Sequence, residues 1–167
     1  MFPEANQRRM ALTKQDYIDP LLVWADMRMK TWPERYYMLY TCASDAGLVA
    51  EATVSAAGKY SCVIVDQGGV SATVDEETAL NIEAKCTLRV KFGPFRVVST
   101  DGELPFNVVG FMWPLLQFLN REGIKAGPQC GADFDHLFIF EDKIDAANRL
   151  IEEFIASAKE KAQSRKS

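Results

Sequence analysis

Hydrophobic positions recur at helical spacing in three parts of the chain. Asp19 and Pro20 predict the start of the first helix, because an aspartate N-cap precedes a proline at the first helical position. Residues 108–120 predict the second helix, and Gly123 is suited to the left-handed position that follows a helix. Asp142 predicts the N-cap of the last helix. The apolar stripe of that helix is Ile144, Ala147, Leu150, Ile151, Phe154 and Ala158.

Runs of β-branched and aromatic residues predict strands between these helices. Residues 67–69 (Gln-Gly-Gly) separate two such runs, which predicts a β-hairpin. Segment 48–57 fits either a short helix or an extended segment, and the pattern leaves both open. The Gly-Pro pairs at 93–94 and 127–128 are expected to break strands. The expected strands are 35–42, 60–66, 70–74, 85–92, 95–99, 124–126 and 136–140.

The order of these elements predicts an α+β fold, with an antiparallel or mixed sheet and helices on one face. Two sheet units are expected. The first is predicted to be incomplete, because it has lost most of its helix, and the second to be complete. We predict four parts: an N-terminal extension with one helix (1–34), the first unit (35–84), the second unit (85–158) and a basic tail (159–167).

Composition narrows the functional classes. The 167 residues carry a net charge of −4, which argues against nucleic-acid binding, because a phosphate backbone requires a basic face. No apolar run approaches the roughly 18 residues of a membrane-spanning helix, and no signal peptide is visible. We therefore expect an intracellular, cytoplasmic protein, with import into an organelle left open.

The reactive residue types are sparse. Four cysteines lie far apart and the chain has one histidine, so no zinc-ligand spacing is present, and we expect reduced thiols in the core. His136 opens an apolar strand, where a structural role is favoured over a catalytic one. Phosphate-binding, dinucleotide and calcium loops are absent from the sequence. We therefore expect no metal, no cofactor and no enzymatic activity.

Two segments carry the strongest indication of a binding site. Residues 102–110 contain a glycine at each end and run into the apolar stretch 111–119. Gly110 stands where a loop becomes a helix, and backbone amides at such a position can face a small anion. The second segment is 129–136, in which Asp133 and Asp135 lie two residues apart before the last predicted strand.

These segments, taken in order, resemble a known family. The motif Phe134-Asp135-His136 precedes Glu141-Asp142-Lys143-Ile144, residues 102–110 precede an apolar helix, and a Val-Asp-Glu-Glu run occupies 74–77. Over about 100 to 120 residues this pattern is similar to the ACT-like family, which contains the CASTOR-type arginine sensors and small bacterial ACT-domain proteins. The resemblance implies a ferredoxin-like ACT fold.

The resemblance also implies a function. Members are non-catalytic regulatory modules, often dimeric, which hold an amino acid between neighbouring ACT units and signal to a protein partner. By this likeness, Asp135 would hold a ligand amino or guanidinium group. The implied ligand-binding residues are Val108, Val109 and Gly110 through their backbone, together with Cys130, Gly131, Asp133 and Asp135.

A second reading keeps the fold without the ligand. The chain would then be an accessory or structural subunit of a larger protein complex. Residues 20–31 and the last helix would dock on the partner. Trp24, Met29 or Trp32 would anchor that interface, because tryptophan is favoured at interface hot spots.

Overall fold

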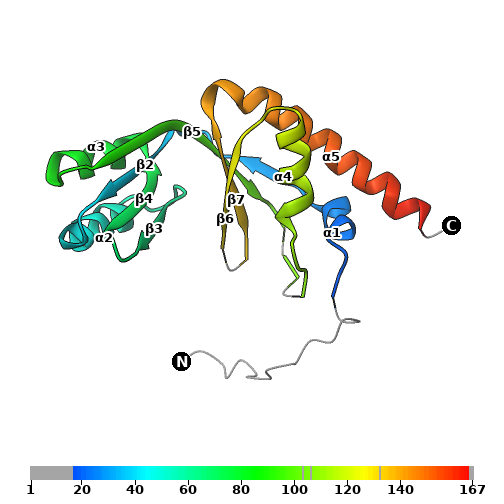
Figure 1. Cartoon of the computed structure of the whole chain (residues 1–167), viewed down its shortest axis with the longest axis horizontal. Coiled ribbons are helices and arrows are strands. Elements are labelled where there is room, and N and C mark those ends of the chain that lie inside the picture. Colours follow the sequence, from blue (N-terminus) through cyan, green and yellow to red (C-terminus); the bar gives the residue numbers. More distant parts are fainter. Residues whose placement is uncertain (1–16, 103, 106, 132, 166–167) are drawn as a thin grey trace, which may run out of the picture.

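The structure, a computed structural model, describes residues 17–102, 104–105, 107–131 and 133–165 (Figure 1). Its helices are α1 (Pro20–Asp26), α2 (Ala46–Ser55), α3 (Glu76–Lys85), α4 (Met112–Arg121) and α5 (Ile144–Ser164). Its strands are β1 (Met29–Thr31), β2 (Tyr36–Thr41), β3 (Cys62–Val65), β4 (Val70–Asp75), β5 (Val90–Thr100), β6 (Ala126–Cys130) and β7 (Asp135–Phe140). The short 3-10 helices η2 (Ala43–Asp45) and η3 (Glu141–Lys143) precede α2 and α5.

The described strands form one antiparallel sheet in the order β3-β4-β2-β5-β7-β6, and β1 pairs with β5 beside this path. Figure 1 shows two halves, with α2 and α3 over one and α4 and α5 over the other. The predicted α+β fold with an antiparallel sheet is therefore confirmed.

The first half follows the βαββαβ order of a ferredoxin-like unit along the chain, and the second half has the same strand arrangement with its last strand supplied from before the first unit. The first unit runs β2-α2-β3-β4-α3-β5 along the chain. The second runs β5-α4-β6-β7-α5, and β1 completes its sheet by pairing with β5. The expectation of an incomplete first unit is wrong, because segments 46–55 and 76–85 are both helical. Segment 1–34, treated as an extension with one helix, also supplies a strand to the second unit; the four-part division itself stays a prediction.

Strand β5 belongs to both units. Its first half pairs with β2, where Val90 lies opposite Tyr40 and Phe95 opposite Tyr36. Its second half pairs with β7 and β1, where Thr100 lies opposite Met29. The expected break at Gly93 does not end the strand. A Cβ there would lie 2.8 Å from the Tyr36 carbonyl oxygen, so glycine lets the two backbones approach closely at an irregular step in the pairing.

All of the α-helices that cover the sheet lie on one of its faces. Leu39 of β2 packs in the core under α2 and α3, and Val98 of β5 packs in the core with α1, α4 and α5. Tyr36 and Val97 alternate with these residues and point to the opposite face, where they form an aromatic cluster with Tyr60. We call that face the open face. The predicted placement of helices on one face is confirmed.

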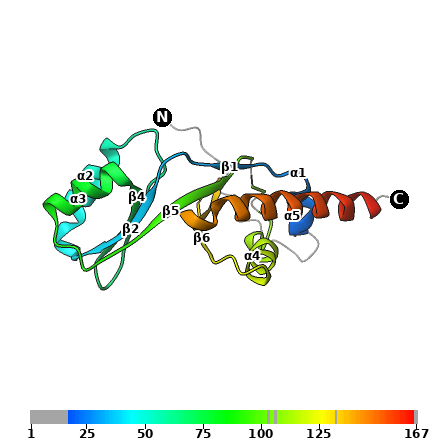
Figure 2. The same cartoon turned by 90° about the horizontal axis from the view of Figure 1, so that it is seen from above.

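Helix α1 is an integral part of the second unit. Trp24 is 0% exposed and lies in the same core as Leu115 and Ile151 of α4 and α5. Figure 2 shows α5 running beside β1 and across α1 towards the C-terminus. Trp24 is therefore a core residue, and its predicted role as an exposed interface anchor is wrong.

Four local expectations also change. Segment 48–57, left open above, lies largely in α2. The strand expected at 85–92 starts only at Val90, because Asp75 caps α3 with its side chain and the helix continues to Lys85. The second helix begins at Met112, after Gly110 takes a positive φ of 70°. The pair at 127–128 lies inside β6, since an edge strand tolerates proline.

The start of the last helix also differs from the prediction. Helix α5 follows η3, and Lys143 occupies its N-cap position without a side-chain hydrogen bond, so Asp142 is not the cap. The predicted apolar stripe of α5 is confirmed: Ile144, Ala147, Ile151, Phe154 and Ala158 are buried. Among the described residues, no helix combines the length and hydrophobicity that crossing a membrane requires.

Candidate functional site

The loop between β5 and α4 holds the first group of predicted ligand residues. The Val108 amide donates a hydrogen bond to the Pro105 carbonyl (3.1 Å), so this donor is already used within the loop. Gly110 accepts from the Trp113 amide (3.1 Å), and the side chain of Val109 is 62% exposed. Because α4 starts at Met112, residues 108–110 precede the first helical turn. Residues 108 and 110 are therefore each held by a backbone hydrogen bond.

The β6–β7 hairpin holds the second group. The Gly131 amide donates to the Phe134 carbonyl (3.0 Å), and a Cβ at Gly131 would lie 2.5 Å from that oxygen, so only glycine fits the turn. Cys130 lies opposite Asp135 at the base of the hairpin. Partial burial raises the pKa of the Cys130 thiol, and the negative charge of the neighbouring Asp135 carboxylate raises it further. Asp133 lies exposed on the turn.

Asp135 is the buried member of this group. It is 7% exposed, and its amide donates to the Thr100 hydroxyl (3.0 Å) at the end of β5. Thr100 also lies directly before the loop that leads to 108–110, so both predicted groups lie at the same end of the second unit. Within the described residues, no hydrogen bond or ion pair joins Asp135 to residues 108–110. The ligand role of the seven residues stays a prediction.

A chain of polar side chains on the open face was not predicted. The Trp32 indole Nε1 donates to Ser99 Oγ (2.8 Å), and Ser99 Oγ lies 2.6 Å from His136 Nδ1. The indole only donates, so Ser99 Oγ accepts from Trp32, and the direction of the Ser99–His136 bond is set by the tautomer of the imidazole. The other ring nitrogen, Nε2, lies 3.7 Å from the position of the missing Cβ of Gly131. Burial lowers the pKa of His136, which keeps the ring neutral.

Tyr60 packs against this chain at the junction of the two units. Its ring centroid lies 4.6 Å from that of His136 and 5.8 Å from that of Tyr36. The residue is 7% exposed, its hydroxyl finds no nitrogen or oxygen partner among the residues that the structure describes, and burial raises its pKa. The expectation of a structural His136 therefore acquires a physical basis: a neutral ring held by Ser99 inside an aromatic cluster.

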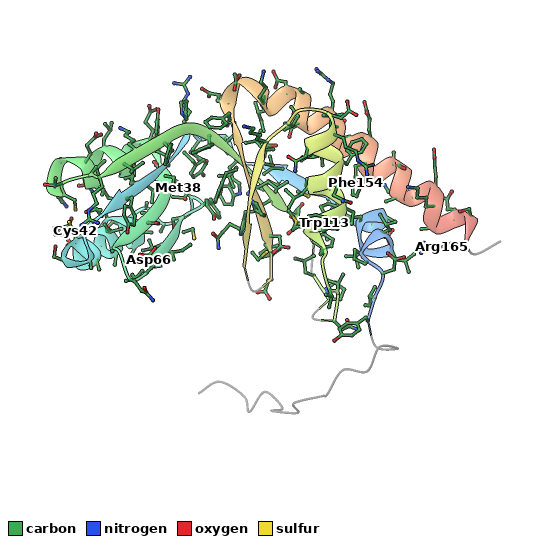
Figure 3. All side chains as sticks on the ribbon, in the orientation of Figure 1. Met38, Cys42, Asp66, Trp113, Phe154 and Arg165 are labelled. Atoms are coloured by element: carbon green, nitrogen blue, oxygen red, sulfur yellow. The ribbon has the colours of Figure 1, made fainter. Side chains whose placement is uncertain are left out.

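A groove of about 600 Å³ lies elsewhere, between β1 and α5. Its floor is apolar and its rim carries charges of both signs. It contains none of the seven predicted ligand residues. Figure 3 marks Arg165 and Phe154 on α5, the helix that forms one wall of the groove. The residues that line it include Arg28, Met29, Thr31, Asp101, Asn148, Ile151, Glu152, Ile155 and Lys159.

Among the described residues, no group of three or more histidine, cysteine, aspartate or glutamate side chains is placed to hold a metal ion. The clusters described above supply hydrogen-bond donors and charges.

No protein-family model matches the chain, and no curated protein matches it in sequence. Solved structures do match it in shape. A Vibrio cholerae protein of unknown function is 17% identical, with a TM-score of 0.61 over 81% of this chain and 94% of that one. An Agrobacterium tumefaciens protein is 16% identical, with a TM-score of 0.61 over 77% and 89%.

The regulatory subunit of aspartate kinase from Thermus thermophilus is 14% identical, with a TM-score of 0.53 over 75% of this chain and 95% of that one. At such identities the likeness shows the fold. Together with the strand order of both units, it confirms the ferredoxin-like ACT fold that the sequence motifs predicted.

Proposed function

We propose that this chain is a non-catalytic regulatory module with two ACT-type units, which binds an amino acid and signals the bound state to a protein partner. The observation that carries the proposal is strand β5, which is shared by both units. A ligand that shifts the second half of β5 also shifts the half that pairs with β2. The ligand site and the first unit are then coupled through β5, and regulation requires such a coupling between two parts of the chain.

The comparisons support the regulatory part. The chain matches 95% of the length of an aspartate kinase regulatory subunit, which is a regulatory protein by its own description. The sequence motifs point in the same direction, since the resemblance to CASTOR-type sensors implies an amino acid as ligand and pairing with a second copy or another protein. Both of these finer features belong to the proposal.

The chemistry of the reactive groups supports the absence of catalysis. Burial raises the pKa of the Cys62 and Cys86 thiols, and the pKa of Cys130 is raised as well. A raised pKa leaves the thiol protonated at neutral pH, and the thiolate is the nucleophilic form. Ser99, whose hydroxyl lies 2.6 Å from His136 Nδ1, is only 4% exposed and also accepts from the Trp32 indole, so a substrate does not reach it as a nucleophile.

A thermal-shift screen with the twenty amino acids tests the proposal. An amino acid present at 100 times its dissociation constant stabilises the folded chain by about 2.7 kcal/mol. For a chain of this size, that stabilisation raises Tm by about 5–10 °C. The proposal fails if no amino acid changes Tm at millimolar concentration.

The second candidate function is that of an accessory subunit, and the exposed residues that favour it lie at and before α4. Trp113 in the first turn of α4 and Val109 in the loop before it are each 62% exposed, and exposed aromatic residues suit a protein interface. Figure 3 shows Trp113 at α4. An accessory subunit would show no Tm shift with any amino acid, and Trp113→Ala would weaken its binding to the partner without changing its Tm.

A further inference from the structure

The two walls of the groove between β1 and α5 run antiparallel, which fixes the order of the residues along it. Arg165 pairs with Asp19, the rings of Phe154 and Trp24 meet at 5.4 Å, and the Thr31 hydroxyl donates to Asn148 Oδ1 (3.1 Å). These three contacts show that α5 runs antiparallel to segment 19–31. Arg28 therefore lies towards the Lys159 end of the groove, and Thr31 lies at the opposite end, beside Asn148.

The charges of the groove are separated along this direction. Lys159 lies seven residues after Glu152, which places the two side chains on one side of α5 about 10 Å apart along the axis. Arg28 and Asp101 lie 4.0 Å apart on the opposite rim. Within the described residues, neither Glu152 nor Lys159 takes part in an ion pair. The groove thus has a cation at one end and a carboxylate further along.

An apolar strip lies between these charges. Met29 of β1 and Ile151 and Ile155 of α5 line the groove and form part of the main core or pack against it. A ligand with hydrocarbon between two polar ends would bury that hydrocarbon here, at about 25 cal/mol per Å² of apolar surface.

Strand β1 adds backbone groups to the same wall. The Asp101 amide donates to the Arg28 carbonyl, and the Trp32 amide donates to the Val97 carbonyl, so Arg28 and Trp32 direct these groups towards β5. Alternation in an antiparallel ladder then turns the amides and carbonyls of Met29 and Thr31 towards the free edge. These groups are hydrogen-bond donors and acceptors for a ligand.

We propose that this groove is the amino-acid site of the module and that its ligand is an α-amino acid with a cationic side chain. Lys159 and Arg28 hold the α-carboxylate, and Asp101 holds the α-ammonium. The aliphatic stem lies along Met29 and Ile155. Glu152 receives the terminal cation, which lysine carries on a four-carbon stem. This inference rests on the proposed function and gives it a site that differs from the hairpin and loop residues considered above.

Titration calorimetry with lysine, norleucine and glutamate tests the class of ligand. Norleucine has the stem of lysine without the terminal ammonium, so it isolates the contact to Glu152. We expect lysine to bind about 10-fold more tightly than norleucine, and glutamate to bind more weakly than either. Equal affinity for lysine and norleucine, or tighter binding of glutamate, would overturn the proposed class.

Charge-neutralising variants test the location. Lys159→Met should weaken lysine and norleucine alike by about 10-fold, whereas Glu152→Gln should weaken lysine and leave norleucine unchanged. The matched controls Lys161→Met and Glu153→Gln alter the same helix outside the groove and should change neither affinity. All four side chains are exposed, so circular dichroism should show an unchanged fold.

Two outcomes separate the failure of this inference from the failure of the proposed function. If an amino acid binds and both groove variants keep full affinity while Asp135→Ala abolishes it, the site is at the β6–β7 hairpin and the groove inference is refuted. If none of the twenty amino acids binds the unaltered chain, the proposed function itself is refuted, and the groove assignment falls with it.

Discussion

Trp24 provides the most informative single substitution for the fold. Its indole stacks on the ring of Phe111 with centroids 4.2 Å apart and meets the ring of Phe154 edge-on. Its Nε1 donates to the Phe111 carbonyl at 2.7 Å, and the residue is fully buried. Helix α1 is only seven residues long. This one side chain therefore ties a short helix to both helices of the second unit.

Trp24→Ala should cost about 4 kcal/mol of unfolding free energy, because truncating a buried tryptophan costs about 3–5 kcal/mol. Trp24→Phe should cost about 1–3 kcal/mol, since it retains a ring but leaves the Phe111 carbonyl without its donor. With an m-value of about 2 kcal/mol per M urea, the alanine variant should lower the urea midpoint by about 2 M.

The matched control is Trp113→Ala, because Trp113 is 62% exposed on α4. Its cost should be within about 0.5 kcal/mol of zero. Urea unfolding followed by far-ultraviolet circular dichroism measures all three variants. A cost below about 1 kcal/mol for Trp24→Ala, equal to that of the control, would refute the assignment of α1 to the core and would restore Trp24 as an interface residue.

Three further predictions concern stability. Burial alone would raise the pKa of Asp75, but hydrogen bonds from Lys59 and Thr78 outweigh it, so the pKa is lowered. The stability that the ionised Asp75 contributes is therefore present above the pKa of the unfolded chain, about 3.9, and is lost at lower pH. Asp75→Asn should therefore flatten the acid limb of the curve of unfolding free energy against pH, and an unchanged limb would contradict this. Gly110→Ala should lower the free energy of unfolding by about 1–2 kcal/mol, because it forces a residue with a side chain to a φ of 70°. Gly47→Ala inside α2 should raise that free energy by about 0.5–1 kcal/mol, because alanine favours a helix. Urea unfolding measures both variants, and equal effects would refute the conformational argument. Because burial lowers the pKa of His136, the stability that the neutral ring contributes is present above the pKa of the unfolded chain and is lost as pH falls below it. Nuclear magnetic resonance titration should give a pKa below about 6.5 for His136, and a higher value would contradict the buried, neutral ring.

Local patterns predicted the elements whose shape depends on neighbouring residues in sequence. Residues 67–69 formed the expected hairpin turn, because the Asp66 side chain accepts from the amides of Gly68 and Gly69. The α5 stripe follows from helical spacing alone. The strand predicted at 136–140 is β7, which ends at Phe140 as expected and starts one residue earlier, at Asp135.

Features that depend on register or on distant packing could not be read in this way. Ser99 and His136 are 37 residues apart and meet only because β5 and β7 pair in that register. Helix α3 was missed although its cap is local, with the Asp75 side chain accepting from the amides of Glu77 and Thr78. Arg28 and Glu152 face one groove only after α1 and β1 have packed on α5.

The second unit shows the largest gap between pattern and fold. Its fourth strand, β1, is only three residues long and lies before the first unit in the chain. A run of three residues carries no strand periodicity, and pairing with Thr100 across about 70 residues is decided by tertiary contacts. The motif order was sufficient for the ACT-type fold class but not for the way the two units share β5.

Hydrogen exchange measured by mass spectrometry, with and without millimolar lysine, shows whether the chain binds a ligand and whether β5 couples its two units. We predict slower exchange in β1 and α5, where the ligand would lie, and also in β2, which pairs with the first half of β5. Unchanged exchange throughout the chain with lysine and with each other amino acid would contradict the claim of a ligand-binding regulatory module. Protection confined to β1 and α5 would contradict the coupling of the two units through β5.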